Sequence, residues 1–336
     1  MNRHRQLTAG GSTPRLVYII GSARSGSTLL DTILGANPDV ESVGELACAV
    51  RYGWLGGGYC ACGQLVERCT FWCRVRELWS ERIGGDRLEA YEALLRRVEL
   101  SRLWWMRLGR GDGGQGAWLV RYGRWTRALL EAIRQTSGKS VVVDSSKLRS
   151  RGLALAAVGG IDLRLIHLVR DVRGVVWSIK KRLSPNRRAG LPRGLRPRPA
   201  WRTALGWVAA NLQAELVCRA AGPGRWLRVR YEDLVSDPAG VLDRIGRFIG
   251  ADLEPVRTAV LAGRWVPVGH TVAGNRMRMA GRVRLQADWE WQERLSAADR
   301  RICGLAAGWL MQRYGYRPDV VRGDGLGERD LREAAA

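Results

Sequence analysis

The chain has 336 residues, 46% of them hydrophobic and 26% charged, and its 55 Lys and Arg against 32 Asp and Glu give a formal net charge of +23. This balance is typical of a soluble globular protein with an ample core. No apolar run approaches the ~20 residues that a membrane-spanning helix needs. Residues 1–14 also lack the apolar stretch of a secretory signal, so we expect a cytoplasmic protein.

Arginine dominates the positive charge, because only four of the 55 basic residues are lysines: Lys139, Lys147, Lys180 and Lys181. A field of this sign attracts polyanions such as nucleotides, acidic glycans or nucleic acid. A coding bias toward arginine would give the same composition. Since the arginines are spread along the chain, without an aromatic RNA-binding signature or a helix-turn-helix pattern, small anionic ligands are favoured over nucleic acid.

A strand, a glycine-containing loop and a helix are predicted near the start of the chain. Residues 16–20 form a short, β-branched apolar run that is typical of a buried central strand. The loop 21–28 follows, and then a helix through residues 29–34 that stops near Asn37-Pro38. This order of elements is the context that a phosphate-binding loop requires.

The rest of the chain alternates between helical and strand patterns. Helices are predicted between 74 and 135, with a glycine-rich break at 111–116, and at 172–181 and 238–249. Buried strands are predicted at 141–143, 163–169 and 226–230. The alternation predicts an α/β fold, a P-loop-like three-layer sandwich in which helices flank a central parallel sheet. We expect one domain over 14–318, flexible tails at 1–13 and 319–336, and an irregular Pro- and Arg-rich segment at 184–199.

The loop after the first strand nearly matches the phosphate-binding pattern G-x-x-x-x-G-K-[ST]: it reads Gly21-Ser22-Ala23-Arg24-Ser25-Gly26-Ser27-Thr28. Ser27 stands where the pattern has lysine, and Arg24 places a cation inside the loop instead. Backbone N–H groups and a helix N-terminus still point at an anion. The missing lysine favours a ligand transferred without a triphosphate–Mg²⁺ arrangement.

A second motif follows the strand at 163–169. That strand ends at Arg170, and Ser178 comes eight residues later on the next predicted helix. A guanidinium offers a bidentate fork to a phosphate, and a hydroxyl adds a further donor. An Arg-Asp pair after a strand is, taken alone, more often a structural ion pair. Two such motifs in this order, each after a buried strand, are much harder to obtain by chance.

Together the two motifs resemble those of sulfotransferases that use 3′-phosphoadenosine 5′-phosphosulfate (PAPS), and the chain resembles a bacterial member of that family. The resemblance implies that the 5′-phosphosulfate is held by Arg24, Ser25, Gly26, Ser27 and Thr28. It implies that Arg170 and Ser178 bind the 3′-phosphate, that Tyr231 lies near the adenine, and that Arg276 closes over the 3′-phosphate side. Arg278 is the alternative to Arg276 in the segment Gly274-Asn275-Arg276-Met277-Arg278.

The same resemblance suggests the catalytic residues. Asp144-Ser145-Ser146-Lys147 is similar to the family's acceptor-side segment, where the Lys147 ammonium would stabilise charge on the departing phosphate. Residues 148–151 lack the histidine base of the cytosolic small-molecule enzymes, so the chain is nearer the branch of carbohydrate and protein-tyrosine sulfotransferases. In that branch a glutamate is the base, which here is Glu45. His270 and Asp144 are the reserve candidates, and His167, inside an apolar strand, is expected in the core.

The predicted reaction is transfer of a sulfuryl group from PAPS to a hydroxyl of a small-molecule, glycan or lipid acceptor, with Arg24 and Lys147 stabilising charge and no metal required. Peripheral membrane contact is left open by the acceptor class, and nothing in the sequence indicates an oligomeric state. Two alternatives remain. A P-loop kinase would need the absent lysine, and a basic non-catalytic polyanion binder would be indifferent to adenosine 3′,5′-bisphosphate.

Four of the seven cysteines are clustered in the sequence: Cys60, Cys62, Cys69 and Cys73. They could bind zinc, but Cys-x-Cys is not the usual Cys-x2-Cys knuckle. Local disulfides are the alternative, and a reducing cytoplasm disfavours them. We therefore predict a structural role and assign no metal.

Overall fold

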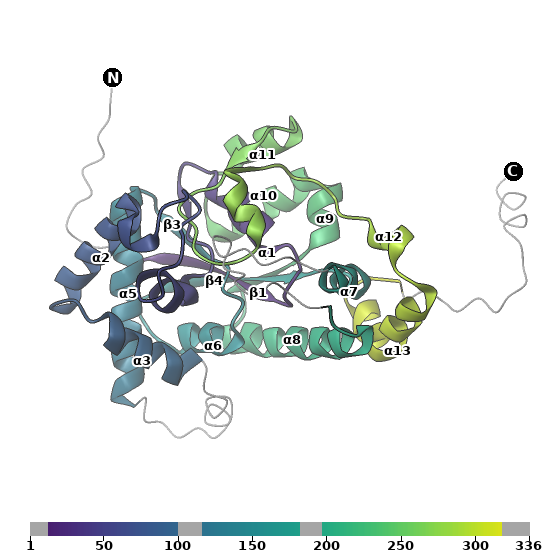
Figure 1. Ribbon diagram of the computed structural model, residues 1–336, viewed down its shortest axis with the longest axis horizontal. Helices are drawn as coiled ribbons and strands as arrows, with labels where there is room; N and C mark the ends of the chain where they lie inside the picture. Colours follow the sequence, from purple (N-terminus) through teal and green to yellow (C-terminus); the bar gives the residue numbers. More distant parts are fainter. Residues whose placement is uncertain (1–12, 100–115, 182–196, 318–336) are drawn as a thin grey trace, which may run out of the picture.

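The computed structural model describes residues 13–99, 116–181 and 197–317. In these ranges a central sheet of five parallel strands has the order β2-β3-β1-β4-β5 (Figure 1). Its strands are β1 (Arg15–Gly21), β2 (Val40–Ser42), β3 (Val141–Asp144), β4 (Asp162–Val169) and β5 (Trp226–Arg230). The central strand pairs on both sides, with Arg15 in register with Val141 and with Asp162.

Alternate residues of β1 build the cores on the two faces of the sheet. Leu16, Tyr18 and Ile20 belong to the cluster beneath α5, α6 and α8, while Val17 and Ile19 belong to the cluster beneath α1 and α10. These helices are α1 (Ser27–Gly35), α5 (Ala117–Ser137), α6 (Arg149–Ala157), α8 (Ala200–Ala221) and α10 (Pro238–Ile249). All five side chains are fully buried, so the predicted three-layer arrangement is confirmed.

Further helices lie at the two ends of the sheet and above it. In Figure 1, α2 and α3 lie beside α5 at one end, and α7, α12 and α13 lie at the other. Their bounds are α2 (Thr70–Ile83), α3 (Leu88–Glu99), α7 (Val172–Lys180), α9 (Tyr231–Ser236), α11 (Glu254–Leu261), α12 (Trp291–Arg294) and α13 (Ala297–Arg313). A two-residue pairing of β6 (Val266–Pro267) with β7 (Arg282–Val283) and short helical turns at 46–48, 49–54, 66–68 and 276–280 complete the described elements.

Several elements are present that the sequence patterns do not predict, among them β2 and α8. Strand β2 has only three residues, and two of them, Glu41 and Ser42, are polar, so no apolar run marks it. Helix α8 is 22 residues long but carries no single apolar stripe. Its buried face includes Asn211 and Glu215, whereas Trp201 is half exposed. The helical periodicity on which the prediction rests is therefore missing.

Some expectations fall on residues that the structure does not describe. These are the two tails, most of the segment 184–199, and residues 111–115 of the expected glycine-rich break. The single-domain organisation over 14–318 stays a prediction. None of the helices in the described ranges has the length and apolar character that crossing a bilayer requires.

Candidate active site

In the described sheet, the carboxyl end of every strand carries a predicted site residue. The loop 21–28 follows β1, Glu45 follows β2, Lys147 follows β3, Arg170 follows β4, and Tyr231 follows β5. In a parallel sheet these ends meet at one edge. The chain passes from β1 to β2 and β3 on one side and then to β4 and β5 on the other, so the loop lies at the switch point where ligands of such sheets bind.

The loop has an unusual backbone that leaves a helix N-terminus open. Gly26 caps α1 in the left-handed conformation, with φ 90° and ψ 12°, and makes no side-chain hydrogen bond to the helix. The first N–H groups of α1 therefore lack a capping side chain, which is the arrangement that anions occupy. Arg24 is also left-handed, with φ 68°, and strain of this kind concentrates at ligand sites.

A pocket of about 210 Å³ opens beside this loop. Its walls come from the loop, the strand ends and a late segment of the chain: Ala23, Arg24, Gly26, Ser27, Thr28, Leu29, Glu45, Lys147, Gly274, Asn275, Arg276 and Met277. The backbone N–H of Asn275 donates to Thr28 Oγ1 at 3.2 Å. The late segment therefore lies against the loop, and Asn275, which was not assigned a role from the sequence, makes the contact.

Unbalanced positive charge distinguishes this pocket. Burial and the neighbouring guanidiniums of Arg276 and Arg170 lower the pKa of Arg24. Neither Arg24 nor Arg276 forms an ion pair with another residue of the described ranges. An anion bound here would relieve the repulsion between the cations. By contrast, Arg278 is buried and donates to backbone carbonyl oxygens, so of the two predicted arginines only Arg276 faces the pocket.

Ser25 supplies a hydroxyl that fits an oxygen-rich ligand. Its side chain is buried, and its Oγ finds no hydrogen-bond partner among the described residues. Buried hydroxyls normally form hydrogen bonds. A buried hydroxyl without one, placed in an anion-binding loop, can donate to a phosphate oxygen.

Arg170 and Tyr231 pack against the loop but do not line this pocket. The Arg170 guanidinium stacks 4.5 Å from the centre of the Tyr231 ring and donates to the backbone oxygen of Arg24 at 3.3 Å. It also pairs with the carboxylate of Asp288 at 3.1 Å. Nothing in the sequence marked Asp288 as a partner, because the two residues are far apart in the chain.

Helix α7 brings Ser178 to the same side as Arg170. A Cβ atom added to Gly174 would lie 2.9 Å from Arg170 Nε, so the arginine packs directly on this glycine. Ser178 is one turn further along α7 and shares the face of Gly174. The pair predicted from the second motif therefore borders one region, with Ser178 half-buried.

The two principal catalytic candidates form an ion pair. Lys147 Nζ lies 2.7 Å from Glu45 Oε1 and also donates to the backbone oxygen of Ser145 at 2.7 Å. The second carboxylate oxygen, Glu45 Oε2, faces the thiol of Cys48 at 3.8 Å. Because both residues line the pocket, a carboxylate and an ammonium are held together beside the cationic loop.

Asp144, a reserve candidate for the base, makes buried hydrogen bonds and an ion pair away from the pocket. It is fully buried and accepts hydrogen bonds from the backbone N–H groups of Leu46 at 3.2 Å and Ser146 at 2.9 Å. Arg151 Nε adds an ion pair at 2.8 Å. The carboxylate joins the segments that carry Glu45 and Lys147, and it does not line the pocket.

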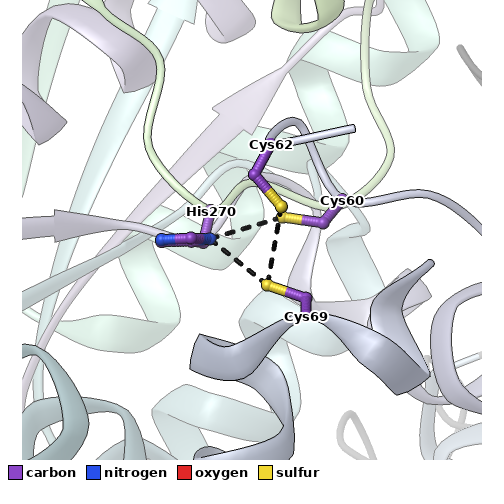
Figure 2. A group of neighbouring side chains, drawn as sticks. All are labelled: Cys60, Cys62, Cys69 and His270. Atoms are coloured by element: carbon purple, nitrogen blue, oxygen red, sulfur yellow. Dashed lines mark hydrogen bonds between the residues drawn. The ribbon is translucent and has the colours of Figure 1, made fainter. Parts of the chain in front are cut away.

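His270, the other reserve candidate, belongs to the cysteine cluster (Figure 2). Its Nδ1 lies 3.3 Å from Cys69 Sγ and 3.7 Å from Cys60 Sγ, and its ring stacks on Phe71. The other histidine in the described ranges, His167, is fully buried as expected. Burial lowers its pKa to about 4, so it is neutral in the core.

The four cysteines that are clustered in the sequence do not all meet in the structure. Cys73 does not join the other three cysteines; its thiol donates to the backbone oxygen of Glu67 at 3.1 Å. His270 takes the fourth place instead. Cys73 follows Cys69 by one helical turn, but Cys69 caps α2 and points into the preceding loop, whereas Cys73 lies within the helix.

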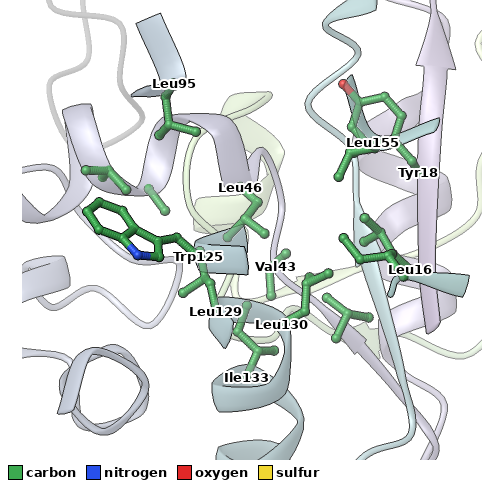
Figure 3. Packing of buried hydrophobic residues seen from close by; sticks show 14 of the residues in the cluster. Leu16, Tyr18, Val43, Leu46, Leu95, Trp125, Leu129, Leu130, Ile133 and Leu155 are labelled. Atoms are coloured by element: carbon green, nitrogen blue, oxygen red, sulfur yellow. The ribbon is translucent and has the colours of Figure 1, made fainter. Parts of the chain in front are cut away.

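The segment carrying Glu45 is fixed by the core on both sides of the glutamate. Val43 and Leu46 are buried in the cluster that includes Trp125 and Leu130 of α5 (Figure 3). The backbone N–H of Glu45 donates to the carbonyl oxygen of Val272 at 2.8 Å. Only the glutamate side chain therefore leaves the core toward the pocket.

Comparison with known proteins places this chain in a family. Residues 68–255, more than half of the chain, match the Sulfotransferase family. The protein belongs to the sulfotransferase family. As a sulfotransferase it is an enzyme, which confirms the predicted class and decides against a kinase and a non-catalytic polyanion binder.

Solved structures of other sulfotransferases are similar to this one at low sequence identity. The sulfotransferase domain of the Synechococcus PCC 7002 olefin synthase is 20% identical, over 90% of this chain and 89% of that one, with a TM-score of 0.40. STF9 from Mycobacterium avium is 12% identical, over 91% and 78%, with a TM-score of 0.45. A sulfotransferase from Alicyclobacillus acidocaldarius is 13% identical, over 91% and 97%, with a TM-score of 0.37. No curated protein matches the sequence.

Proposed function

We propose that this sulfotransferase takes its sulfuryl group from PAPS and transfers it to a hydroxyl of a small-molecule, glycan or lipid acceptor, with Glu45 as the general base. The observation that carries the proposal is the unbalanced charge of Arg24 and Arg276 beside a loop whose helix N-terminus is uncapped. A ligand with two separated phosphate groups suits this site, because Arg170 adds a third cation that contacts the loop outside the pocket.

The donor would bind across the loop. The N–H groups at the start of α1, with the hydroxyls of Ser25 and Ser27, would hold the 5′-phosphate, and Arg24 would contact the sulfuryl group. Arg170 and Ser178 would bind the 3′-phosphate. That phosphate would replace the Asp288 carboxylate, which pairs with Arg170 in the structure.

Glu45 and Lys147 would act at the transferred group. As the acceptor oxygen forms its bond to sulfur, the bond from sulfur to the bridging phosphate oxygen breaks, and the hydroxyl proton moves to Glu45. Lys147, 2.7 Å from Glu45, would turn its positive charge toward the leaving phosphate oxygen. The products are a sulfate ester and adenosine 3′,5′-bisphosphate.

The acceptor would approach through a second pocket of about 200 Å³ on the Glu45 side. Cys48 lines this pocket and lies 3.8 Å from Glu45 Oε2, and Leu148, the neighbour of Lys147, forms another wall. Tyr52 is 56% exposed at its edge, where its ring can stack on a sugar or another flat ring. Tyr52→Ala should raise the acceptor KM and leave binding of the bisphosphate unchanged.

Calorimetry with adenosine 3′,5′-bisphosphate tests the donor assignment, with ATP–Mg²⁺ and heparin as competing ligands. We expect binding of the bisphosphate alone at moderate salt, and loss of measurable binding in Arg24→Ala and Arg170→Ala. Arg74→Ala is the control, because it removes an equal charge from an exposed ion pair on α2. Equal binding of heparin and the bisphosphate, with no effect of Arg24→Ala, would overturn the donor assignment.

Turnover of labelled PAPS with a panel of hydroxyl acceptors tests the base. Glu45→Gln keeps the shape of the side chain and should bind the bisphosphate normally while losing at least ~100-fold in kcat. Normal turnover by this variant would exclude Glu45 as the base.

A further inference from the structure

Three cysteines and one histidine from separate segments of the chain converge beside the active site (Figure 2). Cys60 and Cys62 lie on a tight loop, Cys69 caps α2, and His270 comes from the late segment, 210 residues after Cys60. We propose that Cys60, Cys62, Cys69 and His270 bind one structural zinc ion. The inference does not depend on the identity of the sulfate donor or acceptor.

The distances between the ligand atoms suit a tetrahedral ion. With Zn–S near 2.3 Å and Zn–N near 2.0–2.1 Å, neighbouring ligand atoms of a tetrahedral site lie about 3.6–3.8 Å apart. Cys62 Sγ lies 3.7 Å from Cys69 Sγ, and His270 Nδ1 lies 3.7 Å and 3.3 Å from the sulfurs of Cys60 and Cys69. All four atoms fall within 4.8 Å of one another.

The donor set selects the metal and its role. Soft thiolates with one imidazole in tetrahedral geometry favour zinc. Four protein ligands leave no open position, and this is what separates structural from catalytic zinc sites. Cys69 is placed at the N-terminus of α2, where the helix stabilises a thiolate.

A buried arginine balances the charge of such a site. Three thiolates, one neutral imidazole and Zn²⁺ carry a net charge of −1, and the Arg278 guanidinium lies next to them. Arg278 Nη1 donates to the backbone oxygens of Tyr59 at 3.0 Å and Thr271 at 3.3 Å. These residues directly precede Cys60 and follow His270, so one cation holds both ligand-bearing segments together.

Disulfide bonding explains the cluster less well. A disulfide would use two of the three sulfurs and leave the third cysteine and His270 without a shared partner. None of Cys60, Cys62 and Cys69 forms a disulfide in the structure, and the sulfurs of Cys62 and Cys69 are 3.7 Å apart, far beyond the bond length of ~2.05 Å. The participation of a histidine from so distant a segment points to a metal.

The site would hold the late segment against the catalytic glutamate. Val272, two residues after His270, donates its N–H to the carbonyl oxygen of Val43 at 3.1 Å and accepts from the N–H of Glu45 at 2.8 Å. On its other side it pairs with Cys60. Zinc binding would therefore fix the backbone between the metal and the pocket, since such ions couple binding to folding.

Metal analysis of the full chain, purified without a histidine tag and dialysed against metal-free buffer, tests the proposal directly. Elemental mass spectrometry should find about one zinc ion per chain. Cys69→Ser and His270→Ala should each lose most of the bound zinc. Cys73→Ser is the matched control, because this cysteine lies near the cluster but bonds to Glu67, and it should keep its zinc. Cobalt reconstitution should produce a thiolate-to-cobalt charge-transfer band.

A second measurement uses the wild-type chain, so the proposal can be tested even if the Cys69 and His270 variants fail to fold. Removing the metal with a chelator under reducing conditions should speed amide hydrogen exchange at Val272 by at least about tenfold, and added zinc should restore protection. A wild-type chain that binds no zinc on reconstitution would overturn the proposal. A chain whose mass shows a disulfide within the cluster in place of zinc would do the same.

Discussion

Gly26 allows a test of how tightly the loop and the first residue of α9 fit together. Its φ of 90° and ψ of 12° lie in the left-handed region, where alanine costs about 1–3 kcal/mol. A Cβ atom would also lie 2.6 Å from Cδ2 of Tyr231, whereas carbon atoms in contact are about 3.5–4.0 Å apart. The ring would have to move by about 1 Å, and overpacking of this kind costs a further ~1–3 kcal/mol.

Gly138→Ala separates the two contributions. Gly138 ends α5 with φ 72° and ψ 7°, and a Cβ atom there would meet nothing within 4 Å. Urea unfolding of both variants should therefore show Gly26→Ala to be less stable than Gly138→Ala by ~1–3 kcal/mol, the overpacking cost alone.

Binding of adenosine 3′,5′-bisphosphate gives a second readout for Gly26→Ala. Because Arg170 stacks 4.5 Å from the Tyr231 ring, a displaced ring also displaces the arginine, and we expect at least ~tenfold weaker binding, or about 1.4 kcal/mol. Gly138→Ala should bind as the wild type does. Equal stability of the two variants together with normal binding by Gly26→Ala would refute this account of the loop.

Three further changes are expected to have distinct effects. Burial raises the pKa of Asp31 from 3.8 to about 8, so the folded chain keeps a proton that the unfolded chain loses above pH 4. The stability of the wild type therefore falls as the pH rises from about 4 to 8. Asp31→Asn lacks this loss, and thermal unfolding should show that its stability relative to wild type increases by at least ~1 kcal/mol between pH 5 and pH 8. Arg151→Met leaves the buried carboxylates of Glu99 and Asp144 unpaired, and urea unfolding should show a loss of ~3–5 kcal/mol. Asp288→Asn removes the carboxylate that occupies Arg170, so calorimetry should show tighter binding of the bisphosphate, by up to ~tenfold.

Each of these expectations has a result that contradicts it. A pH-independent difference between Asp31→Asn and the wild type would mean that Asp31 ionises normally in the folded chain. Stability of Arg151→Met within ~1 kcal/mol of wild type would mean that the two acids are protonated or solvated. Weaker binding by Asp288→Asn would show that this residue supports the donor site instead of competing for it.

The parts of the site that follow strands could be predicted from local patterns. The loop 21–28 and Arg170 each come directly after an apolar run, and the geometry of a parallel sheet brings such positions to one edge. Glu45 and Lys147 meet for the same reason, since β2 and β3 are neighbours. The resemblance to sulfotransferases supplied Glu45 as a candidate, because β2 is too short to be recognised by itself.

Other features depend on contacts between distant segments that no local spacing records. Asp288 pairs with Arg170 across 118 positions, and His270 completes a cluster for which the nearby Cys73 was the obvious fourth member. Helix α8 was missed because its buried face includes Asn211, which hydrogen-bonds His167 at 3.0 Å. In each case a polar residue makes a tertiary contact that overrides the pattern of its own segment.

The position of β1 in the middle of the sheet affects how the chain folds while it is being synthesised. It precedes the other strands of the described sheet in the chain, yet its two neighbours begin at Val141 and Asp162. Both hydrogen-bonding edges of this largely apolar strand therefore stay open at least until residues Val141–Asp144 have been synthesised, and open edges of this kind invite pairing with other chains. A fragment limited to residues 68–255, the region that defines the family match, would lack β1 altogether. It would leave β3 and β4 on either side of a missing strand.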